Sequence, residues 1–191
     1  MYPQYVIVND KKYDINTDFR VAIRCSKIAT DKSINNTERA LAIIYLLFGE
    51  EALKDDENGA LLLEKALYYL SCGKEIEQNN EEPDMDYEED MDYIEASFMS
   101  DYHIDLSNIK MHWWKFNKLI NGLSNSEMGN CCVLNRIRNL RNYDISTIKD
   151  RKEREKIKKA KERVALHTKE KQITQEQEES ATKFFELLGG E

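Results

Sequence analysis

Apolar residues recur at the spacing of an α-helix in two stretches near the middle of the chain. The first stretch contains Tyr87, Met91, Ile94, Phe98 and Tyr102. The second contains Trp113, Phe116, Ile120 and Leu123, with His112 and Leu119 at its flanks. Steps of three and four residues place such side chains on one helix face. Residues 102–107 lack this period, so the pattern predicts a helix–connector–helix unit over 84–123.

The N-terminal segment has the pattern of a β-hairpin. Tyr5–Val8 and Tyr13–Ile15 are short apolar runs on either side of the polar tetrad Asn9–Lys12, which is typical of two strands and a turn. An isolated hairpin is marginally stable in water, so we expect this one to pack on helices. Thr17 is the expected N-cap of the next helix, which continues to about Thr30.

Two apolar helices are expected next. Asn35 and Glu38 have the spacing of a capping box, and Gly49 is the expected stop. The apolar face of the first helix is predicted to be Leu41, Ile44, Tyr45 and Phe48. Because that segment is apolar almost all round, the pattern favours a central place in the core. A second helix, ending near Gly73, has Leu62, Leu63, Ala66, Leu67 and Leu70 on its apolar face.

The C-terminal part changes from apolar to basic. Ser124 and Glu127 indicate a further capping box, before a helix with Met128, Cys131, Cys132, Leu134 and Ile137. Arg151–Lys171 is then predicted to be a long exposed helix, in which Asp150–Arg154 and Glu155–Lys159 are spaced for ion pairs. The chain ends in a predicted amphipathic helix with Ala181, Phe184, Phe185 and Leu188 on one stripe.

These elements predict a mainly α fold, a multi-helix domain with a small N-terminal β-hairpin and a C-terminal helical arm. Residues 1–145 are the expected helical domain, whose halves are separated by an acidic linker at about 74–86 that contains Pro83. Residues 146–191 are expected to hold the basic helix and the terminal amphipathic helix.

Composition narrows the class of protein. The chain has 191 residues, 41% hydrophobic and 34% charged, which allows a real core beneath a heavily solvated helical surface. Its net charge of −8 makes nucleic acid an unlikely partner for the molecule as a whole. No apolar run is long enough to cross a membrane, and we expect no signal peptide. The four cysteines lack metal-ligand spacing, which favours a reducing cytoplasm.

Candidate metal and catalytic motifs are weak. Asp84–Glu95 has the length of a calcium loop, but Glu89 stands where the loop needs glycine, so an acidic solvated helix start is favoured. His112 has no second histidine or cysteine at ligand spacing and is expected to be satisfied by a neighbour. No nucleotide loop or nucleophile elbow is visible. We therefore expect no cofactor, no metal and no enzymatic activity.

Protein binding is the better-supported use of the surface. Trp114 points away from Trp113 on its helix, together with Lys118, so it either covers another helix of the same chain or anchors a partner. Phe184, Phe185 and Leu188 form a second candidate anchor, for the chain's own core or for a neighbouring copy. The basic stretch 149–171 is favoured as a solvated helix over an anion-binding surface. An acidic partner, including another copy, stays open for it.

The order of motifs in Asp90–Leu123 resembles the bacteriophage gene-product-fifteen family. The motifs are Asp-x-x-Tyr-Ile from Asp90, Ser97-Phe98, Tyr102-x-Ile-Asp-Leu and His112-Trp-Trp-x-Phe. Residues 16–21 and 151–166 resemble the family's entry helix and basic helix. One departure is His103, where a small or turn-forming residue is expected.

The resemblance implies a non-catalytic tail assembly chaperone that binds the tape-measure protein while the tail tube is built. It is also consistent with a place in the host cell cytoplasm and absence from the mature virion. Self-association is expected from the C-terminal stripe, which is too short to be stable as a free helix and so needs a surface, such as a neighbouring copy, on which to dock. The alternatives are an acidic inhibitor that mimics nucleic acid, or another host-directed interaction protein, suggested by the acidic run 75–92. A metal-dependent enzyme is a third class.

Overall fold

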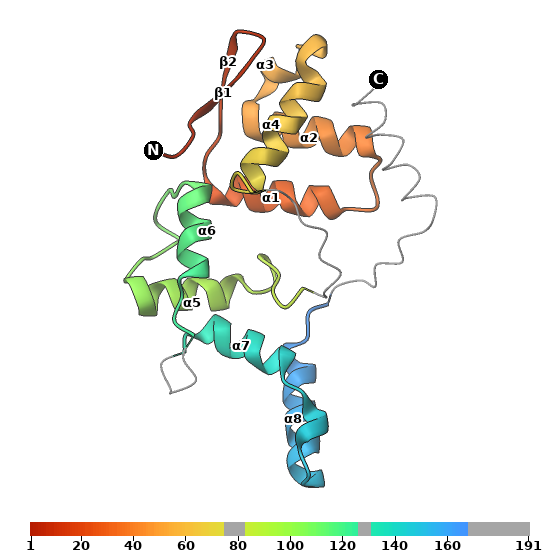
Figure 1. Ribbon diagram of the computed structural model, residues 1–191, viewed down its shortest axis with the longest axis vertical. Helices are drawn as coiled ribbons and strands as arrows, with labels where there is room; N and C mark the ends of the chain where they lie inside the picture. The colour runs from red at the N-terminus through yellow and green to blue at the C-terminus, as the bar shows by residue number, and fades with distance from the viewer. Residues whose placement is uncertain (75–82, 126–130, 168–191) are drawn as a thin grey trace. The chain divides into compact units, whose positions relative to one another are not determined.

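The computed structural model describes residues 1–74, 83–125 and 131–167 (Figure 1). The fold is mainly α, with one two-stranded antiparallel sheet at the N-terminus, as predicted. Contacts divide the chain into two compact units, which are described separately below. Among the described residues, unit 1 comprises 1–74 and 110–117, and unit 2 comprises 83–109, 118–125 and 131–167.

The hairpin of unit 1 forms where the sequence predicts it. Strand β1 (Tyr5–Val8) pairs with β2 (Lys11–Asp14), and Val8 lies opposite Lys11. The turn is shorter than expected, because Asn9 and Asp10 alone connect the strands with φ of 46° and 62°. Positive φ at both positions is what a two-residue turn of this hand requires, and asparagine and aspartate tolerate it. Val8 and Tyr13 point inward and are buried.

Four helices complete the N-terminal part of unit 1. They are α1 (Phe19–Thr30), α2 (Asn36–Phe48), α3 (Glu50–Leu53) and α4 (Gly59–Leu70), the last preceded by the 3-10 turn η1 (Asp56–Asn58). Asp18, not Thr17, caps α1, since its carboxylate accepts from the amide of Arg20 at 2.9 Å. The capping box of Asn35 and Glu38 is confirmed. The hairpin, α2, α3 and α4 share one apolar cluster: Val8, Tyr13, Ile44, Ala52, Leu62 and Leu63.

Helix α6 (Trp113–Asn121) begins in unit 1 and ends in unit 2. Its predicted face is confirmed, because Trp113, Phe116, Ile120 and the following Leu123 are all buried. In unit 1, Phe116 stacks on Phe19 of α1 with ring centroids 4.4 Å apart. The amide of Trp113 donates to the carbonyl of Thr17 at 2.8 Å, which ties the start of α6 to the start of α1.

Unit 2 is built around α5 (Met91–Tyr102), whose predicted stripe is confirmed in its centre: Ile94 and Phe98 are buried. His103 ends α5 in the left-handed conformation, with φ 54° and ψ 36°. The amide of His103 donates to the carbonyl of Met99 at 3.1 Å, the bond of an αL C-cap, and the amide of Ile104 donates to the carbonyl of Phe98 at 3.2 Å. The expectation of a turn at this position is therefore confirmed, with histidine as the turn residue.

Helix α7 (Val133–Asn142) begins later than predicted. Cys132 is its N-cap, and Cys131 lies before it in an isolated bridge to Asn125, so neither cysteine belongs to the helix interior. The amide of Ser124 donates to the carboxylate of Asp101 at 2.7 Å instead of starting a helix. The other capping-box residue, Glu127, lies outside the described residues, as does Met128.

The acidic segment before α5 differs from the expected solvated helix start. Asp90 is fully buried, and both of its oxygens accept hydrogen bonds of 2.7 Å from the guanidinium of Arg141 on α7. Arg141 also donates to the carbonyls of Asp84 and Val164. A single arginine thereby joins the segment before α5 to the ends of α7 and α8. Asp84 makes a further ion pair with Arg138.

The basic helix α8 (Arg151–Val164) follows the 3-10 turn η2 (Ile145–Thr147) and is largely exposed, as predicted, but it ends earlier than the predicted Lys171. Residues 165–167 are not helical, and residues 168–171 lie outside the described part of the chain. The expected pairs Asp150–Arg154 and Glu155–Lys159 do not form. Asp150 caps the helix by accepting from the amide of Glu153, and Arg154 donates to the carbonyl of Ile148. Asp150 and Arg154 are thus each engaged with the backbone instead of with one another. The predicted division of the chain at residue 145 stays a prediction, since the terminal helix on which it depends lies outside the described residues.

Candidate protein-binding surface

The two adjacent tryptophans of α6 both bind the C-terminal end of α4 within unit 1. The indole Nε1 of Trp113 donates to the carbonyl of Leu70, and that of Trp114 donates to the carbonyl of Tyr69, each at 2.9 Å. The last carbonyls of a helix have no partner inside it. The Trp-Trp pair therefore caps α4, a role that its helical spacing does not reveal.

Trp114 is half-buried by this contact, whereas Trp113 is 3% exposed. The ring of Trp114 stacks on Tyr69 at 6.1 Å between centroids and closely approaches Gly73. Of the two predicted uses of Trp114, covering a helix of its own chain is what the structure shows. Its use as an anchor for a partner stays a prediction. Lys118, which is exposed further along α6, also stays a predicted binding residue.

His112 is satisfied by neighbours, as predicted. Its Nδ1 accepts from the amide of Trp114 at 3.0 Å, which leaves Nε2 to donate to the carbonyl of Pro3 at 2.8 Å. The ring also stacks on Tyr2 at 4.9 Å between centroids. All of its polar atoms are used in holding the N-terminus to α6, so it fits a structural role.

The largest departure in the apolar pattern is on α2. The predicted face was Leu41, Ile44, Tyr45 and Phe48, but the buried residues are Ile43, Ile44 and Leu47. Leu41 and Tyr45 are 48% and 51% exposed, one helical turn apart on the outer side of α2. A helix that is apolar all round presents more apolar surface than its own core uses. The apolar residues on every side of α2 therefore indicated an exposed apolar stripe as well as a buried face, and the sequence-based prediction used only the second.

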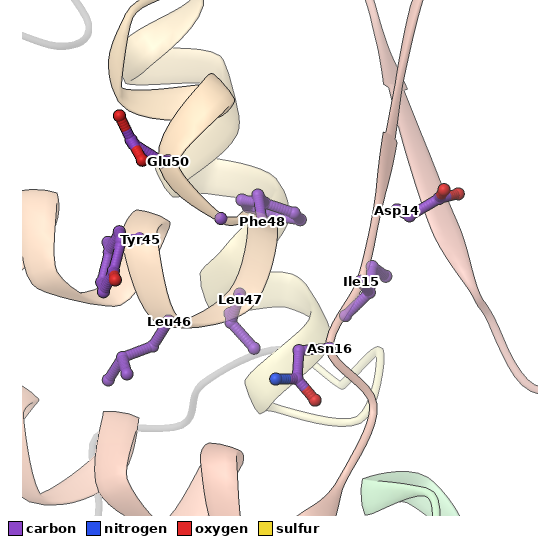
Figure 2. A pocket seen from close by; sticks show the side chains of 9 residues that line it. Asp14, Ile15, Asn16, Tyr45, Leu46, Leu47, Phe48 and Glu50 are labelled. Atoms are coloured by element: carbon purple, nitrogen blue, oxygen red, sulfur yellow. The ribbon is translucent and has the colours of Figure 1, made fainter.

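The outer side of α2 leads into a pocket at the end of the helix (Figure 2). The pocket has a volume of about 470 Å³ and is lined by Asp14–Asn16 from the end of β2 and by Tyr45–Glu50 from the end of α2. Figure 2 shows Leu47 and Phe48 on the side of α2 that faces Ile15 and Asn16, with Tyr45 on the other side of the helix. Leu41 and Tyr45, of which Tyr45 also lines the pocket, form what we call the α2 surface.

Two carboxylates stand at the rim of this pocket. Asp14 and Glu50 are exposed, and among the described residues Asp14 pairs with Lys12 at 2.7 Å and Glu50 with Lys54 at 3.2 Å. Such exposed pairs bind weakly and exchange partners readily. An apolar stripe with an acidic rim is suited to a helical segment that presents large apolar side chains next to lysine or arginine.

The other sequence-based candidates have separate outcomes. Phe184, Phe185 and Leu188 lie outside the described residues, and so does most of the acidic linker.

All four cysteines are free thiols, and burial raises the pKa of Cys25 to about 12. Within residues 1–74, 83–125 and 131–167, no cluster of histidine, cysteine or acidic side chains suited to a metal is found. Those residues likewise include no helix both long and apolar enough to span a membrane.

Comparison with known proteins identifies one family. The family described as Bacteriophage Gp15 protein matches residues 3–166, which include every helix and strand described above. Searches of curated proteins and of solved structures give no match.

Proposed function

Because this chain belongs to the Bacteriophage Gp15 protein family, we propose that it is a tail assembly chaperone, which binds the tape-measure protein during construction of the tail tube. The work is non-catalytic and takes place in the host cytoplasm. The family match is the observation that carries the proposal, since members of this family resemble tail assembly chaperones. The match covers residues 3–166, so the whole described fold takes part in the comparison.

The α2 surface supports the proposal from the side of chemistry. A chaperone for a long helical protein needs apolar surface that is accessible in the folded state. Leu41 and Tyr45 supply such surface, and the neighbouring pocket could take one large side chain. The acidic rim selects for a segment with basic residues beside its apolar ones. The proposed ligand is therefore an amphipathic helical segment of the tape-measure protein.

The acidic inhibitor is a weaker candidate. Mimicry of nucleic acid needs carboxylates that are free to face a partner, at the spacing of phosphates. In unit 2, Asp84 and Asp90 are instead paired with Arg138 and Arg141. Asp105 caps a turn by accepting from Ser107 and Asn108. These internal roles weigh against a surface that imitates a duplex.

Co-expression tests the proposal. The tagged chain would be produced together with the tape-measure protein of the same phage, with the major tail-tube protein of that phage as the control partner. We expect the tape-measure protein to become soluble and to copurify at a fixed ratio. Failure of both, with the chain itself folded, would contradict the proposal. Copurification of the tube protein alone would assign the chain to a different step of assembly.

A further inference from the structure

Helix α8 concentrates positive charge in an acidic protein. It carries eight lysine and arginine residues against three glutamates, a net charge of +5, whereas the whole chain has −8. Four of the basic residues are separated by four, three and four positions, so they share one helix face. These four, which we call the α8 basic stripe, are Lys152, Lys156, Lys159 and Arg163. At about 1.5 Å of rise per residue the stripe is about 16 Å long.

The stripe faces away from the elements on which α8 packs. Ile157, Ala160 and Val164 lie on the other side and are partly buried, where α8 contacts α7 and η2. Lys161 is on that side too and donates to the carbonyl of Tyr143 at 2.6 Å. All four stripe residues are exposed. Within the described part of the chain, none of them takes part in an ion pair or a side-chain hydrogen bond.

The complementary surface is in the same unit. Residues 83–109 contain nine aspartates and glutamates and neither lysine nor arginine. On α5, Asp92 is exposed and Glu95 half-buried, and Met99, 47% exposed, shares their face. We call these three residues the α5 acidic face. Helix α7 packs against both α5 and α8 and lies between them in unit 2 (Figure 1), which keeps the stripe from its own α5.

We propose that the α8 basic stripe docks on the α5 acidic face of a second copy of this chain. Lysine and arginine heads would meet Asp92 and Glu95, and their methylene stems would cover Met99. The segregation of charge within one unit makes that unit complementary to itself. The contact forms either reciprocally, as a two-fold dimer, or head to tail along a row of copies. This proposal does not rest on binding of the tape-measure protein.

Nucleic acid fits the stripe less well than a second copy. Glu155 and Glu162 flank the stripe on α8, and they oppose phosphates and carboxylates alike. The net charge of −8 likewise repels a polyanion and a second copy at long range. What favours the second copy is Met99 on the α5 acidic face, an apolar side chain that the lysine stems can cover.

Sedimentation over a concentration series tests the proposal in 0.05 M and 0.5 M salt. Three double variants keep the comparison matched. Lys156→Glu/Lys159→Glu reverses the stripe, Arg151→Glu/Lys158→Glu makes the same charge change off the stripe, and Asp92→Lys/Glu95→Lys reverses the acidic face. We expect each variant to fold, because all the substituted residues lie outside the buried core. Circular dichroism melts check this.

We expect the wild type to associate in low salt and to dissociate in high salt. The stripe variant and the acidic-face variant should each associate at least tenfold more weakly, and the off-stripe variant should resemble the wild type. A mixture of the two interface variants should associate again. A monomeric wild type, equal behaviour of the stripe and off-stripe variants, or a mixture that stays dissociated would overturn the proposal. Binding of a duplex oligonucleotide that is lost only in the stripe variant, with a monomeric wild type, would assign the stripe to nucleic acid instead.

Discussion

At the scale of residues, Trp113 and Trp114 each donate an indole hydrogen bond to a carbonyl at the end of α4, but Trp113 is buried and Trp114 only half-buried. We expect Trp113→Ala to destabilise the fold by about 3–5 kcal/mol, because it leaves a large cavity. Trp114→Ala should cost less, about 1–3 kcal/mol, since part of that ring already faces solvent. Urea denaturation of both variants checks this. Equal losses would mean that Trp114 is as much a core residue as Trp113.

His103 offers a prediction of opposite sign. Its φ of 54° is a conformation that glycine adopts without strain and that costs other residues about 1–2 kcal/mol. We expect His103→Gly to raise stability by about 0.5–1 kcal/mol, and His103→Val to lower it by more than 1 kcal/mol. Urea midpoints of the two variants would decide the matter. A glycine variant that is less stable than the wild type would show that the imidazole makes a compensating contact.

The sequence predicts directions of residues on a helix better than it predicts their neighbours. Helical spacing placed Trp113, Phe116 and Ile120 on one buried face, which is correct. It also separated Trp114 from them, yet both indoles reach the end of α4, because a long side chain can bend back to a carbonyl beside the core. The sequence likewise could not predict that Ile43 is buried and Tyr45 exposed, since α2 is apolar on every side.

At the scale of elements, the hairpin is tied to the α3–α4 junction through one carboxylate. The carboxylate of Asp55 accepts from Lys11 at 2.6 Å, from the hydroxyl of Tyr13 and from the side-chain amide of Asn58. These hydrogen bonds, that of Lys11 first, lower the pKa of Asp55 to about 2. The unfolded chain has an ordinary aspartate pKa of about 3.9. The folded pKa is the lower of the two, so Asp55 stabilises the fold above pH 4 and loses this effect as the pH falls toward 2.

Thermal melts between pH 5 and pH 2 test the role of Asp55. The wild type should lose melting temperature over this range more steeply than Asp55→Asn, whose side chain does not titrate. Other carboxylates with a lowered pKa, including Asp101 and Asp105, are common to both proteins and cancel in the comparison. Parallel curves for the two proteins would remove Asp55 as the link.

The pair of Asp90 and Arg141 is the corresponding link in unit 2. Hydrogen bonding to Asp90 raises the pKa of Arg141, which stays charged at any usual pH. We expect Arg141→Ala to cost about 3–5 kcal/mol, because it leaves the buried carboxylate of Asp90 unpaired. Arg136→Ala, an exposed change on the same helix, should stay within about 0.5 kcal/mol. Similar losses in the two variants, measured by denaturation, would contradict the assignment.

Elements were predictable where their ends carry local signals. The capping box of Asn35 and Glu38 and the stop at Gly49 set α2 correctly, because both signals act within a few residues. The start of α7 was misplaced by several residues. Ser124 bonds to Asp101, a residue distant in sequence, and the capping pattern does not contain that partner. The pairing of Asp90 with Arg141 is of the same kind.

At the scale of the whole molecule, family membership and exposed apolar surface are separate sources of the functional account. The family match spans residues 3–166 and shows that the chain belongs to the Bacteriophage Gp15 protein family, on which the proposed role in tail assembly rests. The α2 surface is the proposed place for a helical segment to bind. The structure offers a matched comparison for this place, because α4 also exposes one leucine and one tyrosine: Leu61 is 40% and Tyr68 58% exposed.

The most direct test of the account is the affinity of the purified chain for the tape-measure protein, measured by calorimetry with two double variants. We predict that Leu41→Glu/Tyr45→Glu weakens binding at least tenfold, which is about 1.4 kcal/mol, because it places charge on the α2 surface. Leu61→Glu/Tyr68→Glu, the same chemical change on α4, should bind like the wild type. Both variants should keep the wild-type melting temperature within a few degrees. Unchanged binding by the α2 variant, or an equal loss in the α4 variant, would contradict the account.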